Sequence, residues 1–259
     1  MTKYVRYKFK NLISYGILDD VSIREISSSP FGEYNLTGIE VSVSDVRLLA
    51  PVSPSKIVAI GLNYNSHLDG REAPSVPEAF YKVPTSLIGP EDSIIIPKEV
   101  LDNSLSIQPE AELAVVIGKS CKRATKNNAL DYVLGFTCGN DVSVRPWQKN
   151  DLQWWRAKSS DTFAPIGPVI VSGLQHDNLR LQARINGKVV QDQNTSDLIH
   201  NVPSIIEFVS SVVTLNPGDV IMTGTPGSPG DIKSGDIVEV DIGGIGVLKN
   251  FVKNEGESI

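Results

Sequence analysis

Residues 108–118 read QPEAELAVVIG, in which two glutamates open a run of apolar residues. The run of Leu, Ala, Val, Val and Ile is typical of a buried β-strand. Side chains two positions apart on a strand point to the same face, so Glu110 and Glu112 are expected to project together. Ala114 and Val116 continue that face with apolar side chains. The two carboxylates are therefore expected at the mouth of an apolar core.

A third carboxylate, Asp141, follows the apolar stretch YVLGFTCGN, which is expected to be a strand. An isolated Glu-x-Glu is more often a solvated strand face, because Glu is mostly exposed. However, like charges held side by side repel, and a cation between them removes the repulsion. Three carboxylates without Cys or His nearby favour a hard ion, Mg²⁺ or Mn²⁺ ahead of Ca²⁺. The sequence predicts metal ligands at Glu110, Glu112 and Asp141.

The order of several segments resembles the fumarylacetoacetate hydrolase family. The matching segments are GLNYNSHL (61–68), EAE (110–112), Asp141, SVRPWQ (143–148), KSSDTFAPIGP (158–168), GTPGSPG (224–230) and GDIVEV (235–240). Together they span most of the chain. The resemblance implies a mainly β fold with a few helices, a mixed β-sheet roll behind a small N-terminal β domain, and pairing into a homodimer.

The resemblance also assigns roles in a substrate pocket. Lys158 is expected to add positive charge where an oxyanion develops. Arg145 can hold a carboxylate through two hydrogen bonds, and Gln148 and Thr225 are expected to complete substrate binding. Outside this context, Lys158 and Arg145 would be read as a surface lysine and a surface ion pair. The implied substrate is a small anionic 2-oxo or 1,3-dicarbonyl acid that chelates the ion through two oxygens.

The segment around His67 departs from the family pattern. Members that hydrolyse carbon–carbon bonds carry a glutamate three residues after this histidine, and the pair activates water. Here that position is Gly70, and the segment that ends at Phe80 is shorter than usual. Asp69 and Glu72 are the acids available to replace the glutamate. The polar, proline-bearing composition is typical of a mobile loop, and His67 is expected to reach the metal when this lid closes.

Three functions remain open from the sequence. The first is hydrolysis of a carbon–carbon bond in an acylpyruvate-like acid, with His67 as the base. The second is decarboxylation or keto–enol isomerisation of a 2-oxo dicarboxylic acid of aromatic catabolism, such as oxaloacetate or hydroxyheptadienedioate; Gly70 favours it, because these reactions need a proton shuttle but no hydroxide. The third is a ligand-binding protein without catalysis, suggested by Gly70 and by Pro146, which stands where the family usually has Asp.

Composition argues against other classes of function. The 259 residues carry a net charge of −6 and no long basic run, so nucleic acid is not an expected partner. No apolar run approaches the roughly 18 residues of a membrane span, and the start MTKYVRYKFK lacks the apolar core of a signal peptide. A cytoplasmic protein is expected, with Cys121 and Cys138 reduced and buried.

The chain is expected to divide into a small β-rich domain, residues 1–54, and a catalytic domain, residues 55–259, joined at the hinge PVSPS. Strands are expected at 3–9, 22–26, 38–49, 56–62, 93–97, 112–118, 179–187, 219–224 and 236–248. Asn186 and Gly187 predict a tight hairpin.

Two helices are expected, at 126–134 and 203–214. In the second, five apolar residues repeat at helical spacing and predict a core face. They are Ile205, Ile206, Val209, Val212 and Val213.

Overall fold

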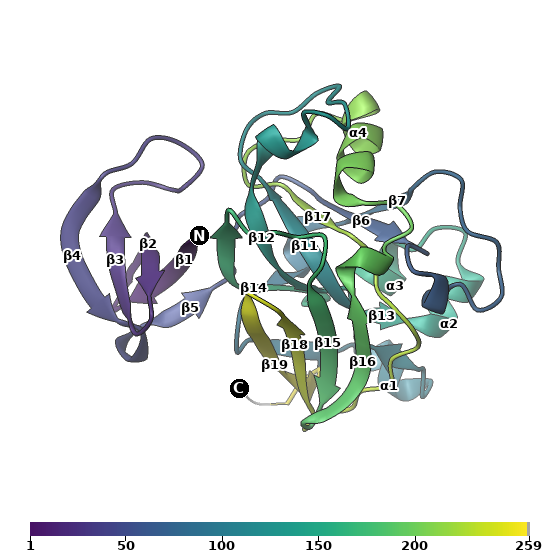
Figure 1. Ribbon diagram of the computed structural model, residues 1–259. Helices are drawn as coiled ribbons and strands as arrows, with labels where there is room; N and C mark the ends of the chain where they lie inside the picture. The colour runs from purple at the N-terminus through teal and green to yellow at the C-terminus, as the bar shows by residue number, and fades with distance from the viewer. Residues whose placement is uncertain (258–259) are drawn as a thin grey trace.

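The structure is a computed structural model that describes residues 1–257. Within that range strands predominate, and the expected mainly β fold is confirmed (Figure 1). The largest sheet has 12 strands, ten of them in one path. Their order is β4 (Leu36–Ser42), β3 (Ser22–Ile26), β2 (Leu12–Asp19), β1 (Thr2–Phe9), β14 (Ala164–Ser172), β12 (Val133–Asn140), β11 (Ala111–Ile117), β17 (Val220–Met222), β6 (Ile57–Gly61) and β7 (Glu78–Lys82). In addition, β5 (Arg47–Leu49) pairs with β1, and β8 (Leu87–Ile88) pairs with β14.

Two smaller sheets complete the strands of the described chain. The five-stranded sheet runs β16 (Lys188–Asn194), β15 (Arg180–Ile185), β18 (Ile237–Ile242), β19 (Gly246–Asn254) and β9 (Ser93–Ile96). The two-stranded sheet joins β10 (Ile107–Gln108) to β13 (Ser143–Val144). Each strand range expected from the sequence overlaps an observed strand, although η1 (Val43–Asp45) interrupts the range 38–49. The hairpin between β15 and β16 is confirmed, since Asn186 and Gly187 both have the positive φ of its tight turn.

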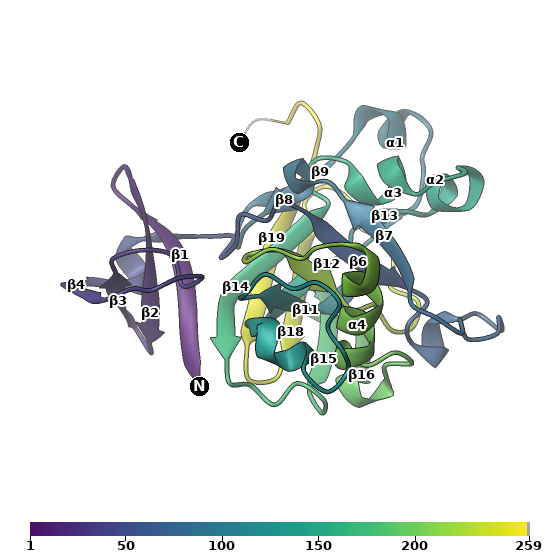
Figure 2. The same ribbon diagram turned by 90° about the horizontal axis from the view of Figure 1, so that it is seen from above.

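The first five strands lie to one side of the remaining elements in both views (Figures 1 and 2). They are still joined to them, because β1 pairs antiparallel with β14, from Thr2 opposite Ser172 to Tyr4 opposite Ile170. The division of the chain into two domains after residue 54 stays a prediction, and so does its pairing into a homodimer. β14 itself is not predicted by the sequence, because Pro165 and Pro168 within it disfavour a strand.

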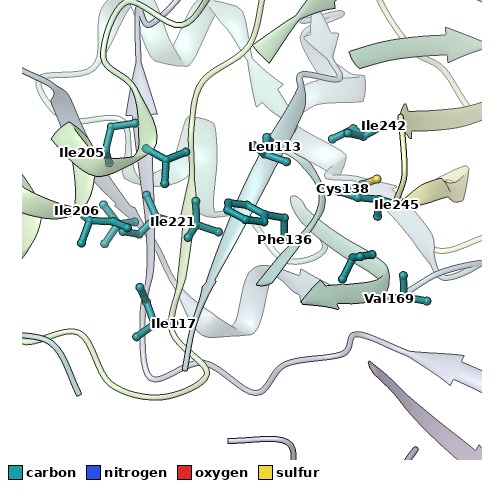
Figure 3. Close-up of a cluster of buried hydrophobic side chains, with 14 of the residues drawn as sticks. Leu113, Ile117, Phe136, Cys138, Val169, Ile205, Ile206, Ile221, Ile242 and Ile245 are labelled. Atoms are coloured by element: carbon teal, nitrogen blue, oxygen red, sulfur yellow. The ribbon is translucent and has the colours of Figure 1, made fainter. Parts of the chain in front are cut away.

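Strand β11 is buried along its whole length, between β12 and β17. One face carries Leu113 into a cluster with Phe136 and Ile221, which Figure 3 shows side by side. The other face places Ala114 and Val116 in a second cluster. Burial on both faces explains why the strand reads as a continuous apolar run. Ala114 and Val116 were predicted to continue the glutamate face of this strand as part of an apolar core, and their burial in this cluster confirms it.

The helix expected at 203–214 is α4 (Val202–Val212), which begins where the Asn201 side chain accepts a hydrogen bond from the Ser204 N–H. Ile205, Ile206 and Val209 face the core, as expected. The inclusion of Val212 in that face is wrong: this side chain is 77% exposed. Val213 follows the helix and is partly buried against the core.

The helix expected at 126–134 is wrong, since the segment forms only a 3₁₀ turn, η4 (Ala129–Tyr132), before β12 begins. Val133 pairs with Ile117, and the N–H of Gly118 donates to the carbonyl of Tyr132. The main-chain groups of Tyr132 and Val133 therefore pair with β11 and the residue after it, so they cannot continue a helix. β-Branched Val133 suits a strand better than a helix.

Three short helices are not predicted from the sequence: α1 (Lys98–Asp102), α2 (Arg145–Asn150) and α3 (Trp155–Ser159). With five or six residues each, they are too short to show helical periodicity. Two of them, α2 and α3, carry side chains of the candidate site. Among residues 1–257, no helix has the length and apolar character required to cross a membrane.

Candidate active site

The three carboxylates predicted as metal ligands lie together and are buried. One oxygen from each of Glu110, Glu112 and Asp141 lies within 4.8 Å of the others. Their closeness follows from the antiparallel pairing of β11 and β12, which places the start of one strand beside the end of the other. Main-chain hydrogen bonding continues past the strands, because the Asp141 N–H donates to the Glu110 carbonyl at 2.9 Å.

Two buried lysines contact this carboxylate cluster. The Nζ of Lys158, on α3, donates to Glu110 Oε2 at 2.6 Å and to Asp141 Oδ2 at 2.7 Å. The Nζ of Lys82, at the end of β7, donates to Asp141 Oδ1 at 2.5 Å and to the main-chain carbonyl of Lys158. The sequence analysis missed Lys82, because a lysine in a polar segment is normally exposed. Only tertiary contact reveals it.

Burial affects the two lysines differently. Burial opposes the charge of Lys158, but the carboxylates of Asp141 and Glu110 outweigh it and raise the pKa of this lysine. Burial lowers the pKa of Lys82, and the nearby Asp141 charge offsets that effect only in part. Lys158 is thus the more firmly charged of the pair.

The carboxylates also differ from one another. Burial disfavours ionisation of Glu110, yet Lys158 and Arg145 outweigh it and lower its pKa. Burial, together with the charges of Asp141 and Glu110, raises the pKa of Glu112 well above its usual value. The cation contacts described above go to Glu110 and Asp141, whereas Glu112 Oε2 accepts a hydrogen bond from the Gly224 N–H at 2.6 Å.

The donor set fits a divalent cation. Glu110 Oε1 is buried and forms an ion pair with Arg145 Nη1 at 2.6 Å, and His67 Nε2 lies 3.8 Å away. Glu112, by contrast, has neither lysine as a hydrogen-bond partner, and an ion placed among the three carboxylates would relieve the repulsion there. Three carboxylate ligands match the preference of hard ions for oxygen.

A cavity of about 430 Å³ opens beside the cluster. Arg145 and Gln148, both on α2, line it together with Gln108. Arg145 Nε donates to Gln108 Oε1 at 2.7 Å, and its Nη1 donates to Gln148 Oε1 at 2.8 Å. The arginine is thereby held on the cavity wall. Pro146 fits the first turn of α2, where a missing N–H costs no helical hydrogen bond.

Thr225 contacts the carboxylate strand and is not among the residues that line the cavity. Its hydroxyl donates to the Ala111 carbonyl at 2.9 Å and accepts from Gln191 Nε2 at 2.8 Å. These contacts hold the GTPGSPG loop against β11. A direct contact of Thr225 with substrate stays a prediction.

His67 lies at the end of η2 (Asn65–His67) and lines the cavity. Its Nδ1 is hydrogen-bonded to the carbonyl of Gly227. Because a carbonyl oxygen only accepts, Nδ1 must carry the proton, and Nε2 of the neutral ring then has its lone pair free.

The two acids proposed to support His67 lie elsewhere on the lid. Asp69 lines the cavity but is exposed, and Glu72 is exposed and outside the cavity lining. Within residues 1–257, neither forms a hydrogen bond or ion pair with His67. The main-chain carbonyl of Gly227 holds the place next to the imidazole that a carboxylate was expected to take.

Comparison with known proteins gives matches over nearly the whole chain. A family model for the fumarylacetoacetate (FAA) hydrolase C-terminal domain matches residues 56–253, and an Rv2993c-like N-terminal model matches residues 2–51. Protein Rv2993c of Mycobacterium tuberculosis is 44% identical, over 92% of this chain and 90% of its own length. The mitochondrial oxaloacetate tautomerase fahd2 of Xenopus laevis is 40% identical, over 82% of this chain and 70% of its own length.

Among solved structures, a 2-hydroxyhepta-2,4-diene-1,7-dioate isomerase from Mycobacterium marinum superposes with a TM-score of 0.91. It is 40% identical in sequence, and the match covers 99% of this chain and all of the other. The mixed-sheet roll expected from the sequence is therefore confirmed.

Proposed function

Because the chain belongs to the fumarylacetoacetate hydrolase family, we propose that it is a divalent-metal-dependent keto–enol tautomerase of small 2-oxo dicarboxylic acids of the oxaloacetate type. The observation that carries the proposal is the placement of His67, whose Nδ1–H is held by the Gly227 carbonyl while Nε2 lies 3.8 Å from Glu110 Oε1, at the carboxylate cluster. Similarity to a tautomerase and to an isomerase supports the same reaction class.

A tautomerase must move one proton between carbon and oxygen, and His67 suits that step. With Nδ1–H held by a carbonyl that only accepts, Nε2 is the nitrogen that can accept the proton and return it. Arg145, held by two glutamines at the cavity wall, binds a carboxylate of the substrate. The Lys158 ammonium supports negative charge that develops on substrate oxygen.

Glu110, Glu112 and Asp141 would hold the ion, and Mg²⁺ or Mn²⁺ suits their oxygen donors. The bound ion would supply Lewis-acid stabilisation of charge on the substrate oxygens.

Hydrolysis, the first hypothesis from the sequence, has less support. Water activation needs a base that becomes a stabilised imidazolium, and a carboxylate partner provides that stabilisation through its negative charge. At Nδ1 the partner is the neutral Gly227 carbonyl, the Glu110 carboxylate lies 3.8 Å from the other nitrogen, Nε2, and among residues 1–257 Asp69 and Glu72 form no hydrogen bond or ion pair with the ring. His67 is thus better placed for proton transfer than for generating hydroxide.

The test follows the disappearance of enol-oxaloacetate by its ultraviolet absorbance, with metal-stripped protein and with added Mg²⁺ or Mn²⁺. Release of CO₂ and cleavage of acylpyruvates are measured in parallel. We expect metal-dependent tautomerisation, lowered about 10²-fold or more in His67→Ala, with little change in Asp69→Asn or Glu72→Gln. Acylpyruvate cleavage or CO₂ release without tautomerisation would refute the proposal, as would full tautomerase activity in His67→Ala.

A further inference from the structure

Asp231 is an exposed acid that the roles described so far do not use. It directly follows the GTPGSPG loop (224–230). The main chain next to it is anchored to β10, because the Ile232 N–H donates to the Ile107 carbonyl at 2.9 Å. The Asp231 side chain is therefore held close to Gln108, the other residue of β10, which lines the cavity.

The hydrogen bonds of Gln108 join Asp231 to Arg145. Gln108 Nε2 donates to Asp231 Oδ1 at 2.7 Å, and Gln108 Oε1 accepts from Arg145 Nε at 2.7 Å. A carboxylate only accepts and the Arg145 Nε–H only donates, so an amide turned the other way would face both neighbours with the wrong group. Asp231 therefore determines that Gln108 turns its oxygen toward Arg145.

The orientation of Arg145 decides which of its nitrogens meets the substrate. Nε is held by Gln108, whereas Nη1 contacts Gln148 Oε1 at 2.8 Å and Glu110 Oε1 at 2.6 Å. Among residues 1–257, Nη2 forms no hydrogen bond or ion pair. Since Arg145 lines the cavity, Nη2 is the nitrogen left for a carboxylate of the substrate.

Loss of this arrangement would weaken binding of the carboxylate. An arginine side chain that is already held loses less conformational freedom when a ligand binds. If the Gln108 amide turned, its NH₂ group would meet the Arg145 Nε–H, donor against donor, and the guanidinium would have to move. The proton transfer assigned to His67 does not depend on these contacts.

We propose that Asp231 is a positioning residue for substrate binding, which acts through the Gln108 amide to hold Arg145 with Nη2 toward a carboxylate of the substrate. This inference rests on the carboxylate binding that the proposed function assigns to Arg145. It adds a residue outside the cavity lining to the specificity for anionic acids.

The test is calorimetric titration of succinate, a non-reactive dicarboxylate with the four carbons of oxaloacetate, in the presence of Mg²⁺. The variants are Asp231→Ala, Gln108→Met and the two combined. Ser106→Ala is the matched control, because Ser106 Oγ also donates to Asp231 Oδ1 at 2.7 Å but takes no part in the contact between Gln108 and Arg145.

We expect Asp231→Ala to raise the dissociation constant about threefold to tenfold, and Ser106→Ala to change it by less than about twofold. In the Gln108→Met background Asp231→Ala should have no further effect, because its route to Arg145 is already broken. Asp231→Asn should bind nearly as wild type, since its amide oxygen can still accept from Gln108. With enol-oxaloacetate, Asp231→Ala should raise KM and leave kcat near that of wild type.

The outcomes separate this inference from the proposed function. An unchanged dissociation constant in folded Asp231→Ala overturns the inference, and so does an equal loss in the Gln108→Met background. If Asp231→Ala does not fold, Gln108→Met decides: weaker binding of succinate supports the inference, and unchanged binding overturns it. Failure of wild type to bind succinate also overturns it, because Arg145 is then not a carboxylate site. Succinate binding without tautomerase activity refutes only the proposed function.

Discussion

Replacing Glu112 by glutamine should have opposite effects on the metal-free and the metal-loaded protein. Burial, Asp141 and Glu110 raise the pKa of Glu112 well above its usual value, so the ionised form is unfavourable in the folded state. Glutamine keeps the shape and an oxygen that can accept the Gly224 N–H. Glu112→Gln should therefore stabilise the metal-free protein at neutral pH, while it removes one of three ligands.

The sign of the pH dependence follows from the raised pKa. Stability contributed by Glu112 is fully present below its unfolded pKa, about 4.3, and is lost as pH rises through the folded pKa. Metal-free wild type should thus lose more stability than Glu112→Gln as pH increases from acid to neutral.

The magnitudes can be worked from the burial of this carboxylate. Removing this unfavourable buried carboxylate should raise the free energy of unfolding by about 1 kcal/mol or more. For a chain of this size, each kcal/mol raises the melting temperature by about 2–4 °C. An ion at a hundred times its dissociation constant stabilises wild type by about 2.7 kcal/mol, and so by roughly 5–11 °C. In Glu112→Gln that increase should largely disappear.

Thermal unfolding of wild type and Glu112→Gln, with chelator or with excess Mg²⁺, tests these values across pH. Glu99→Gln is the matched control, since Glu99 is exposed on α1. The reasoning fails if metal-free Glu112→Gln melts below metal-free wild type, or if Mg²⁺ stabilises both to the same extent.

Three further predictions concern single side chains. Ile205→Ala, in the core face of α4, should lower the free energy of unfolding by about 2–5 kcal/mol, whereas exposed Val212→Ala should change it by about 0.5 kcal/mol or less; denaturant unfolding compares them, and equal losses would contradict the assigned face. Lys158→Met should lower turnover about 10²-fold or more while retaining Mg²⁺ binding by calorimetry, and undiminished turnover would contradict its role. Gly224→Ala should weaken both folding and Mg²⁺ binding, because φ is +103° there and an added Cβ would lie 2.7 Å from the Asn63 Cβ; a wild-type melting temperature and affinity would contradict that.

The sequence predicted those features whose cause is local. The run that starts at Glu112 reads as a strand because β11 is buried on both faces, and the turn at Asn186 and Gly187 reads as a hairpin because both residues accept a positive φ. The pairing of Glu110 with Glu112 on one face follows from the two-residue period of a strand. Asp141 was expected beside them because it follows an apolar strand, the family resemblance assigned it the same role, and the structure brings the three together.

Features whose cause lies far away in the chain were missed or wrong. The helix expected at 126–134 gave way to sheet pairing, and β14 forms despite two prolines because strands on both sides pair with it. Asp69 and Glu72 were named from the sequence as acids that could replace the family's glutamate beside His67, and that role stays a prediction; in the structure a carbonyl 160 positions after His67 holds its Nδ1.

What the sequence by itself determined is thus the local order of this protein: the carboxylate strand, its apolar continuation, the hairpin and the core face of one helix. Each depends on periodicity or on the φ that a residue tolerates, and these are properties of neighbours in the chain. Only the tertiary structure decided the partners of the charged groups. Lys82 and Asp141 are 59 positions apart in the chain and form an ion pair in the fold. Both are buried, and a buried charge without a partner would cost far more free energy than a paired one.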